Sequence, residues 1–318
     1  MFILGERMKK TAILTGGNQG LGFECVQSIA ASGQSWHVVI ASRGMEKARA
    51  AIAKIRAEFP GTSLEALPLD LGSLESVRHF VQIFSTRQDS PPLKAIVCNA
   101  GLQVVGAPHR TRDGFEETFG VNHLGHFLLV NLLLPHLVSP ARIVVVSSGT
   151  HDPATLEGRT SKAYFESTQA LAYPQKATVP LNNFRRYTTS KLCNLLFAYE
   201  LNRRLQAEGL KEITVNTYDP GAVPGTGLTR EYRPFMQQLW GGIAAVFKAL
   251  GYHVSDPRTS GQLMARLVLD PALETASGKY FRGLAEASSS KDSYEIGKAK
   301  ELWAGSAQLV GLGEKAPV

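Results

Sequence analysis

The sequence predicts an α/β fold with a parallel sheet, and three observations lead to that prediction. A glycine-rich segment, residues 15–22, lies between a short apolar run and a helical pattern. Short runs rich in valine and isoleucine then alternate with amphipathic stretches along the chain. No linker, repeat or low-complexity block divides the 318 residues. We therefore expect one domain, residues 1–318, built on a doubly wound parallel sheet with helices on both faces.

The composition argues against several classes of protein. The chain is 44% hydrophobic, which supports a globular core, and its net charge of +7 comes from scattered basic residues without a run of five or six. We therefore expect no nucleic-acid partner. Three cysteines lack metal-ligand spacing and no segment reaches 18 apolar residues, which predicts a reduced, cytoplasmic protein without a metal or a transmembrane helix. Residues 1–10 are expected to form a loose N-terminal extension.

The glycine-rich segment has the composition of a phosphate-binding turn. Its neighbours predict a strand over 11–14 and a helix over 23–31. Glycines allow a tight turn and let backbone amides approach a pyrophosphate, which the helix dipole also favours. This is the arrangement of a Rossmann-type dinucleotide site. The expected cofactor-binding residues in it are Thr15, Gly16, Asn18, Gln19, Gly20, Leu21 and Gly22.

The end of the second predicted strand, residues 36–41, favours NADP(H) as the cofactor. Sites for the unphosphorylated dinucleotide place an Asp or Glu about 20 residues after the glycine turn. Here that place holds Ser42 and Arg43, and an arginine fork suits a 2′-phosphate. The alternative is an incidental surface arginine, because Asn18 and Gln19 add no second cation.

Later strands are expected to bring further residues to the same crevice, because ligands of open α/β sheets bind at the carboxyl ends of the strands. Asp70 and Leu71 follow the third strand, and Asp70 is placed to meet an adenine edge. The fourth strand, 94–98, closes on Asn99–Gly101, where small residues let the chain pass beneath the cofactor. The other predicted elements are helices 45–59, 115–137, 183–205, 261–269 and 294–309 and strands 142–146, 213–218 and 279–281.

Tyr187 and Lys191 are four residues apart on the predicted helix 183–205, so both lie on one face of it. A tyrosine hydroxyl is a poor acid or base at neutral pH, but a cation beside it favours the phenolate. The pair therefore predicts a proton donor and acceptor. The spacing alone is weak evidence, since tyrosine and lysine at this distance are common on solvated helix faces.

Two more polar positions are candidates for the site. Ser148 and its neighbour Ser147 follow the strand 142–146, so their hydroxyls are expected to face the crevice, although either serine could instead cap a turn. Asn122 lies among apolar neighbours in the predicted helix 115–137, where an unpaired amide is costly. We expect it to be either a satisfied structural amide or a residue that shapes the helix and holds a water.

Two segments are expected to form the substrate pocket. Residues 151–186 are irregular, and a loop of this length in a compact domain is usually functional or mobile. Within residues 222–258, Phe235–Leu250 has one apolar face that could cover a hydrophobic substrate, dock on a membrane or form a partner interface. We favour a lid over a hydrophobic small-molecule substrate. Peripheral membrane contact stays open, as does the choice between a monomer and a homo-oligomer.

Five motifs, in order, resemble the short-chain dehydrogenase/reductase family over roughly residues 10–228. They are Thr15-Gly-x-x-x-Gly20-x-Gly22, Asn99-Ala100-Gly101, Asn122, Ser148 and Tyr187-x-x-x-Lys191, and the turn Pro220-Gly221 also matches. Within the family, the chain looks most like the branch of retinol dehydrogenases and light-dependent protochlorophyllide reductases, on segments such as Ser190–Asn194.

The resemblance implies an NADP(H)-dependent oxidoreductase acting on a carbonyl or alcohol. Tyr187 would exchange a proton with the substrate, Lys191 would hold the nicotinamide ribose and lower the pKa of Tyr187, and Ser148 would hydrogen-bond the substrate oxygen. Asn122 would support a water that connects Lys191 to solvent. Cofactor contacts beyond the glycine turn would come from Ser42, Arg43, Asp70, Leu71, Asn99, Ala100, Gly101, Tyr187, Lys191, Pro220 and Gly221.

Two other functions stay open at this point. One is light-driven reduction of a C=C bond in a tetrapyrrole, because Cys193 falls where protochlorophyllide reductases carry a cysteine linked to pigment binding. The long segment before Tyr187 departs from their pigment loop, and we expect no plastid transit peptide. The other is an NADP(H)-binding regulatory protein without turnover. The complete set of Asn122, Ser148, Tyr187 and Lys191 argues against it.

Overall fold

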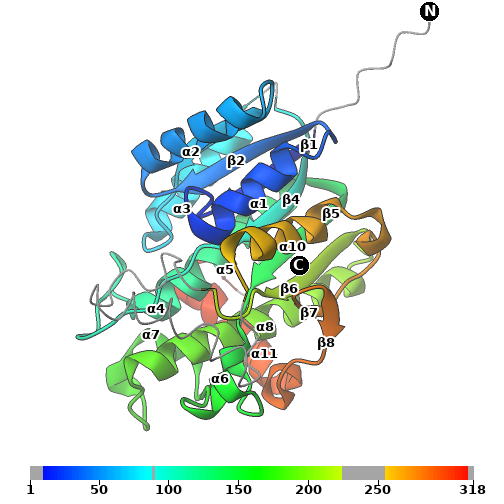
Figure 1. Cartoon of the computed structure of the whole chain (residues 1–318). Coiled ribbons are helices and arrows are strands. Elements are labelled where there is room, and N and C mark those ends of the chain that lie inside the picture. Colours follow the sequence, from blue (N-terminus) through cyan, green and yellow to red (C-terminus); the bar gives the residue numbers. More distant parts are fainter. Residues whose placement is uncertain (1–9, 88–89, 224–254, 314–318) are drawn as a thin grey trace, which may run out of the picture.

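The computed structural model describes residues 10–87, 90–223 and 255–313, which form a three-layer α/β fold around one central sheet (Figure 1). The sheet has eight strands in the order β3-β2-β1-β4-β5-β6-β7-β8. Neighbouring strands are parallel except for the last pair, β7 and β8. The predicted doubly wound parallel sheet is confirmed.

The predicted elements that the structure describes occur in the predicted order, and the helix Leu74–Ser85 was not predicted. The strands are β1 (Lys10–Thr15), β2 (Trp36–Ser42), β3 (Ser63–Pro68), β4 (Leu93–Cys98), β5 (Leu137–Val146), β6 (Ile213–Asp219), β7 (Tyr280–Arg282) and β8 (Ala285–Ala287). The helices are α1 (Gly20–Ala30), α2 (Met45–Glu58), α3 (Leu74–Ser85), α4 (Glu117–Phe119), α5 (Gly125–Leu133), α6 (Leu156–Arg159), α7 (Thr168–Ala172), α8 (Asn183–Ala207), α10 (Pro257–Leu269) and α11 (Ile296–Leu309).

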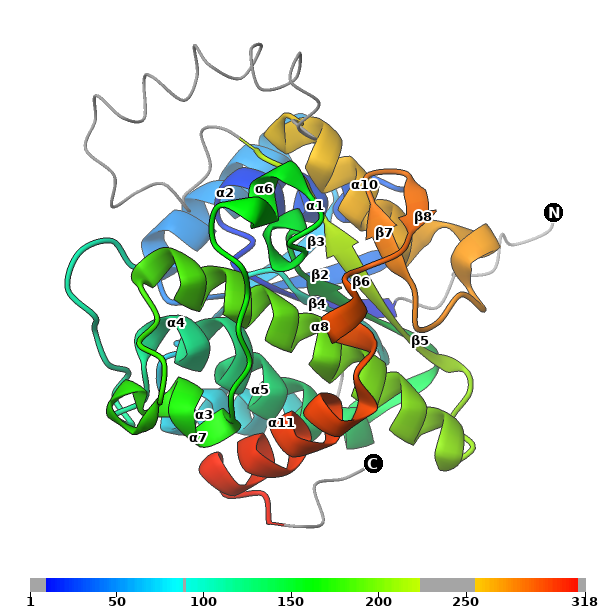
Figure 2. The ribbon, with the colours of Figure 1, turned by 90° about the horizontal axis from the view of Figure 1, so that it is seen from below.

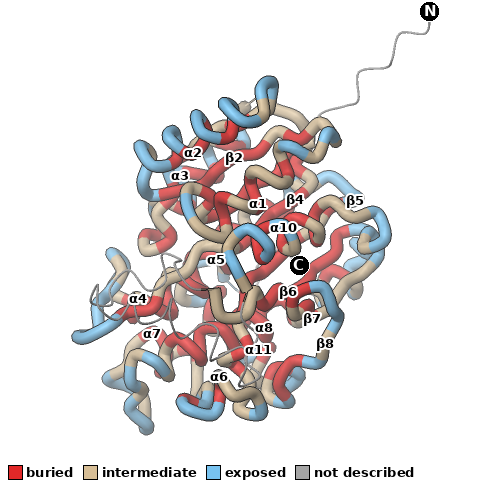
Figure 3. The backbone as a smooth tube through the Cα atoms, in the orientation of Figure 1, coloured by how far each residue is buried: buried red, intermediate tan, exposed pale blue. Residues whose placement is uncertain are grey.

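The two faces of the sheet bury two separate apolar clusters, because side chains alternate along each strand. On β1, Ile13 belongs to one cluster, whereas Ala12 and Leu14 belong to the other. The Ile13 side of the sheet is covered by α3, α5, α8 and α11, and the opposite side by α1, α2 and α10 (Figure 2). The strands are therefore buried on both faces and solvent reaches the outer sides of the helices (Figure 3).

The strand order reverses beside β1, which pairs with β2 on one side and β4 on the other. Chain connections leave the sheet in opposite directions on the two sides of such a point, so a crevice opens at the carboxyl ends of the strands. The glycine turn after β1 lies at this switch point.

The helix predicted over 115–137 is not a uniform α-helix. After α4, residues Gly120–Leu124 form a π-helical turn before α5, and a short 3₁₀ turn, Leu134–His136, follows. A hydrophobic period near 3.6 is shared by these forms, so the sequence pattern could not separate them. The π turn contains Asn122, and such single turns occur often at functional sites.

Other differences from the predicted elements are small. The strand expected to be the last, 279–281, is followed by the short antiparallel β8. The segment 151–186 contains the short helices α6 and α7. The expected lid helix over 235–250 and residues 1–9 of the expected extension lie outside the described residues.

Two buried histidines of this region are held neutral. His123 bonds Ser306 Oγ at 2.9 Å, and His126 lies between the Asn122 carbonyl oxygen at 3.2 Å and Thr15 Oγ1 at 2.9 Å. Burial lowers the pKa of His123 to about 3, and the positive charge that His126 would carry lowers it further. Burial also lowers the pKa of His126 to about 4, and the Lys191 ammonium adds to this effect.

The free energy of unfolding should therefore fall as the pH drops below about 6.5, the ordinary pKa of histidine in an unfolded chain. Between that pH and about 4, each histidine is protonated in the unfolded chain but not in the folded chain. The free energy of unfolding therefore falls by roughly 1.4 kcal/mol per pH unit for each histidine. His126→Gln should remove the contribution of one histidine from this slope. Urea unfolding at pH values from 5 to 7.5 checks it, and identical slopes in both proteins would contradict it.

Candidate active site

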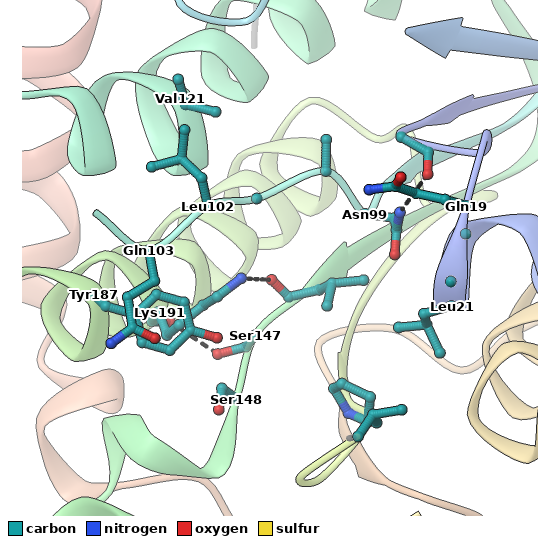
Figure 4. Close-up of a pocket in the computed structure, with 18 of the residues that line it drawn as sticks. Gln19, Leu21, Asn99, Leu102, Gln103, Val121, Ser147, Ser148, Tyr187 and Lys191 are labelled. Atoms are coloured by element: carbon teal, nitrogen blue, oxygen red, sulfur yellow. Dashed lines mark hydrogen bonds between the residues drawn. The ribbon is translucent and has the colours of Figure 1, made fainter. Parts of the chain in front are cut away.

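The carboxyl ends of the parallel strands surround a cavity of about 1090 Å³ (Figure 4). All predicted site residues except Thr15 and Asn122 line this cavity. They come from the turns after β1, β2, β3, β4, β5 and β6 and from α8. The cavity therefore contains the glycine turn and the Tyr187–Lys191 pair together, as the sequence predicted.

The glycine turn has the geometry of an anion cradle. Gly16 and Gly20 have φ angles of 70° and 55°, which favour glycine. A Cβ atom on Gly22 would lie 2.3 Å from the Gly16 carbonyl oxygen, so only glycine fits in the first turn of α1, where the helix packs against the glycine turn. The N-cap residue of α1, Gln19, makes no side-chain capping bond, and no acidic residue stands in the first turn. The first N–H groups of the helix can therefore donate to a pyrophosphate.

Thr15 does not line the cavity but binds the backbone of residues that do. Its Oγ1 accepts hydrogen bonds from the backbone N–H groups of Asn99 and Ala100, each at 3.0 Å. The Asn122 carbonyl can only accept, so Nδ1 of His126 carries the proton and Nε2 accepts from the Thr15 hydroxyl. Thr15 thus fixes the segment after β4 to the end of β1.

Asn122 fixes the same segment further along the chain. Its Oδ1 accepts from the Leu102 N–H at 2.8 Å, and its Nδ2 donates to the Leu102 carbonyl at 2.9 Å and to Ser190 Oγ at 3.0 Å. The amide is therefore satisfied by protein groups, which accounts for a polar side chain with no exposed surface. That Asn122 also supports a water remains a prediction.

Tyr187 and Lys191 are both buried, with 6% and 4% of their surface exposed, so they are not on a solvated helix face. Lys191 Nζ lies 5.6 Å from the centre of the Tyr187 ring and donates to the Val146 carbonyl at 3.4 Å. Burial lowers the pKa of Lys191 to about 8, while the Asp219 carboxylate opposes this shift. At neutral pH the ammonium is still mostly charged, and it faces the cavity beside the phenol.

The two serines after β5 have different surroundings. Ser147 is buried, and its Oγ donates to the Lys191 carbonyl at 2.9 Å. Ser148 Oγ accepts from the Thr150 hydroxyl at 3.1 Å and from the Thr150 N–H at 3.4 Å. Ser148 therefore caps the turn, as the alternative interpretation expected, and also lines the cavity.

A polar cluster beneath Ser148 was not predicted. His151 donates from Nδ1 to the Ser148 carbonyl at 2.6 Å and accepts from the Ser290 N–H at 3.0 Å. Nearby, the buried Asp219 pairs with Arg282 at 3.4 Å, and both of these residues line the cavity. Asp219 is the last residue of β6 and Arg282 the last residue of β7, and a charged residue at the carboxyl end of a strand is the signal that could have identified them.

The other end of the cavity carries two exposed cations. Arg43 was predicted there, and Lys47 lines the cavity one helical turn later, so a second cation that the sequence argument missed is present. Glu46 also lines this end and partly offsets their charge. Ser42 Oγ accepts from the Gly44 N–H at 3.2 Å, which shapes the turn into α2.

Cys193, considered for pigment binding, is packed in the core with no exposed surface, and the cavity lining does not include it. No helix in the described ranges is long and apolar enough to cross a membrane.

Comparison with known proteins identifies relatives along nearly the whole chain. The family model for short chain dehydrogenase matches residues 10–160. Protochlorophyllide reductase of Chlamydomonas reinhardtii is 37% identical, over 96% of this chain and 79% of the relative. Mouse retinol dehydrogenase 13 is also 37% identical, over 95% and 84%. The solved RhlG/NADP complex of Pseudomonas aeruginosa has a TM-score of 0.63 over 86% of this chain and 94% of its own, and at 23% identity it supports the fold alone. The predicted family is confirmed.

Gly22→Ala should weaken dinucleotide binding, because the added methyl group would lie 2.3 Å from the Gly16 carbonyl oxygen and 2.6 Å from Asn99 Nδ2. We expect the affinity for NADPH to fall at least tenfold, with about 1–3 kcal/mol lost from the free energy of unfolding. Fluorescence titration with NADPH and urea unfolding measure the two effects. Gly297→Ala is the control, because nothing lies within 4 Å of the added atom. Unchanged NADPH affinity in Gly22→Ala would contradict the assignment of the glycine turn as the dinucleotide-binding site.

Proposed function

Because this chain belongs to the short-chain dehydrogenase/reductase family, we propose that it is an NADP(H)-dependent oxidoreductase that interconverts a carbonyl and an alcohol on a hydrophobic small molecule. The observation that carries the proposal is the burial of Tyr187 and Lys191 side by side at a cavity that also contains Ser148 and the glycine cradle. A buried cation next to a phenol has no purely structural need, since an apolar pair would fill the space at lower cost.

The residues divide the chemistry among them. Tyr187 would give its proton to the carbonyl oxygen in reduction and take it back in oxidation. The Lys191 ammonium favours the phenolate form of Tyr187 and so makes the proton easier to release. The Ser148 hydroxyl would donate a hydrogen bond to the same substrate oxygen and stabilise the charge that develops there. NADP(H), bound along the glycine turn, would supply or accept the hydride.

The cations at the far end support NADP(H) over NAD(H). Arg43 and Lys47 lie at the start of α2, where a 2′-phosphate would meet their positive charge and the N-terminal end of the helix. No acidic residue occupies the end of β2, where a ribose 2′-hydroxyl would need one.

The apolar side chains on the other side of the cavity support the proposal of a hydrophobic substrate. Leu102, Leu156 and Phe184 line it, and two of these come from the segment 151–186 that we expected to form the pocket wall. The retinol dehydrogenase among the relatives is named for an apolar alcohol. Of the proposed lid over 222–258, only the first and last residues are described, and Ala222 and Val223 line the cavity.

Light-driven reduction of a tetrapyrrole is the second candidate, because a protochlorophyllide reductase is 37% identical to this chain. The burial of Cys193 outside the cavity lining argues against it. Illumination of the protein with NADPH and protochlorophyllide separates the two functions, since light-dependent loss of pigment absorbance would favour the second. Tight NADPH binding without turnover on a broad carbonyl and alcohol panel would instead favour a regulatory role.

Tyr187→Phe should reduce turnover by about a hundred- to ten-thousandfold, because it removes the proton donor while the ring remains to fill the site. The dissociation constant for NADPH should change little, which fluorescence titration checks. Loss of NADPH absorbance on the carbonyl panel measures the rate. A rate near that of the wild type in Tyr187→Phe would contradict the proposed role of Tyr187.

Arg43→Gln should lower kcat/KM with NADPH by about ten- to a hundredfold and leave kcat/KM with NADH nearly unchanged, because only the phosphorylated ribose needs the guanidinium. Glu46→Gln is the matched control on the same turn and should favour NADPH slightly, since it removes a negative charge. Steady-state rates with both cofactors measure the effects. An equal loss with NADH, or a wild-type preference for NADH, would overturn the cofactor assignment.

A further inference from the structure

We propose that Gln103 binds a second polar group of the substrate, close to the carbon that is reduced or oxidised. This inference rests on the proposed function and narrows its substrate class to ketones or aldehydes that carry a neighbouring carbonyl or hydroxyl group, and to the corresponding alcohols. Gln103 was not among the residues expected from the sequence.

The first observation is that the Gln103 side chain is polar, lines the cavity and makes no hydrogen bond within the described residues. Only 8% of its surface is exposed, and it lines the cavity. Among the described residues, no hydrogen bond or ion pair involves its amide. Its amide nitrogen and oxygen are not among the polar atoms enclosed without a partner, so they are accessible from the cavity and available to a ligand that replaces water there.

The second observation is the position of Gln103 relative to the acid–base pair. A Cβ atom on Gly101 would lie 3.5 Å from Lys191 Nζ, and Gln103 follows two residues later. Two residues span at most about 7 Å, so the glutamine begins close to the reacting centre. In the view of Figure 4 its side chain points toward Tyr187, and both residues line the same cavity.

The third observation is that the backbone carrying Gln103 is fixed. Asn122 bonds both the N–H and the carbonyl of Leu102, the residue just before it. Thr15 holds the N–H groups of Asn99 and Ala100 in the same segment. Binding a substrate therefore does not require this segment to be ordered first, which lowers the cost of using the glutamine for recognition.

The chemistry of the amide defines the ligand. An amide offers two donors and one acceptor, so it can bind a carbonyl oxygen or a hydroxyl but supplies no charge to balance an ionic group. Leu102, Leu156 and Phe184 surround the same space and suit an otherwise apolar molecule. A hydrophobic α-dicarbonyl or α-hydroxycarbonyl compound meets both requirements.

The test compares two ketones that differ in the second polar group, 1-phenyl-1,2-propanedione and propiophenone, as substrates of the wild type and of Gln103→Met. Methionine keeps the length of the side chain but removes its hydrogen bonds. We expect kcat/KM for the dione to fall about five- to tenfold in Gln103→Met, whereas kcat/KM for propiophenone stays within twofold or rises. Val105→Ala, an exposed change on the same segment, should alter neither value.

Binding measurements separate this inference from the proposed function. Equal losses for both ketones would indicate a structural role, and weaker NADPH binding in Gln103→Met would indicate a cofactor contact; either result overturns the inference and leaves the oxidoreductase in place. Equal kcat/KM values for the dione in the wild type and Gln103→Met would also overturn the inference. If neither ketone is reduced, calorimetric titration of the dione into the NADPH complex decides, because equal affinities in the wild type and Gln103→Met would reject the contact.

Discussion

One side chain, the amide of Asn122, joins the parts of the chain on which the candidate site depends. It binds both backbone groups of Leu102 and reaches Ser190 on α8, so it ties the segment after β4 to the helix that carries the buried tyrosine and lysine. The backbone carbonyl of the same residue, within the π turn, accepts from His126 in the first turn of α5. Because a buried amide is costly when unpaired, the three segments are held in the one arrangement that satisfies it. The shape of the cavity between them follows from that arrangement.

The same burial gives the site its electrostatic character. Lys191 is removed from solvent and its pKa falls to about 8, yet Asp219, itself without exposed surface, keeps enough negative charge nearby for the ammonium to persist. A cation held in a medium of low dielectric acts more strongly on a neighbouring phenol than one in water. Arg282 pairs with the same carboxylate at 3.4 Å. The positive charges of Lys191 and Arg282 are therefore offset by one buried carboxylate, whereas Arg43 and Lys47 at the other end of the cavity are exposed.

The cofactor half of the site could be predicted from the sequence because it follows from local rules. A strand, a glycine turn and a helix start must lie together, and a four-residue spacing places Tyr187 beside Lys191 on any helix. The missed features depend on the tertiary structure. The π turn at Gly120–Leu124 has the same apolar period as an α-helix, and Asp219 meets Arg282 only because β6 and β7 are neighbours in the sheet. Gln103 could not be recognised, since its lack of a partner is visible only once its surroundings are known.

The cofactor half of the cavity is lined mainly by backbone groups and the substrate half mainly by side chains. This difference explains why the chemistry is easier to infer than the substrate. The cofactor half consists of backbone at strand ends and of glycines, whose geometry tolerates few substitutions, as the 2.3 Å approach at Gly22 illustrates. The substrate half consists of side chains such as Leu156, on the short helix α6, and Phe184, in the first turn of α8 at the end of the irregular segment. Side chains on such a segment can change without disturbing the sheet. Specificity then depends on the few substrate-side groups that a fixed backbone holds in place, and Gln103, five residues after the end of β4 and next to the anchored Leu102, is the clearest of them.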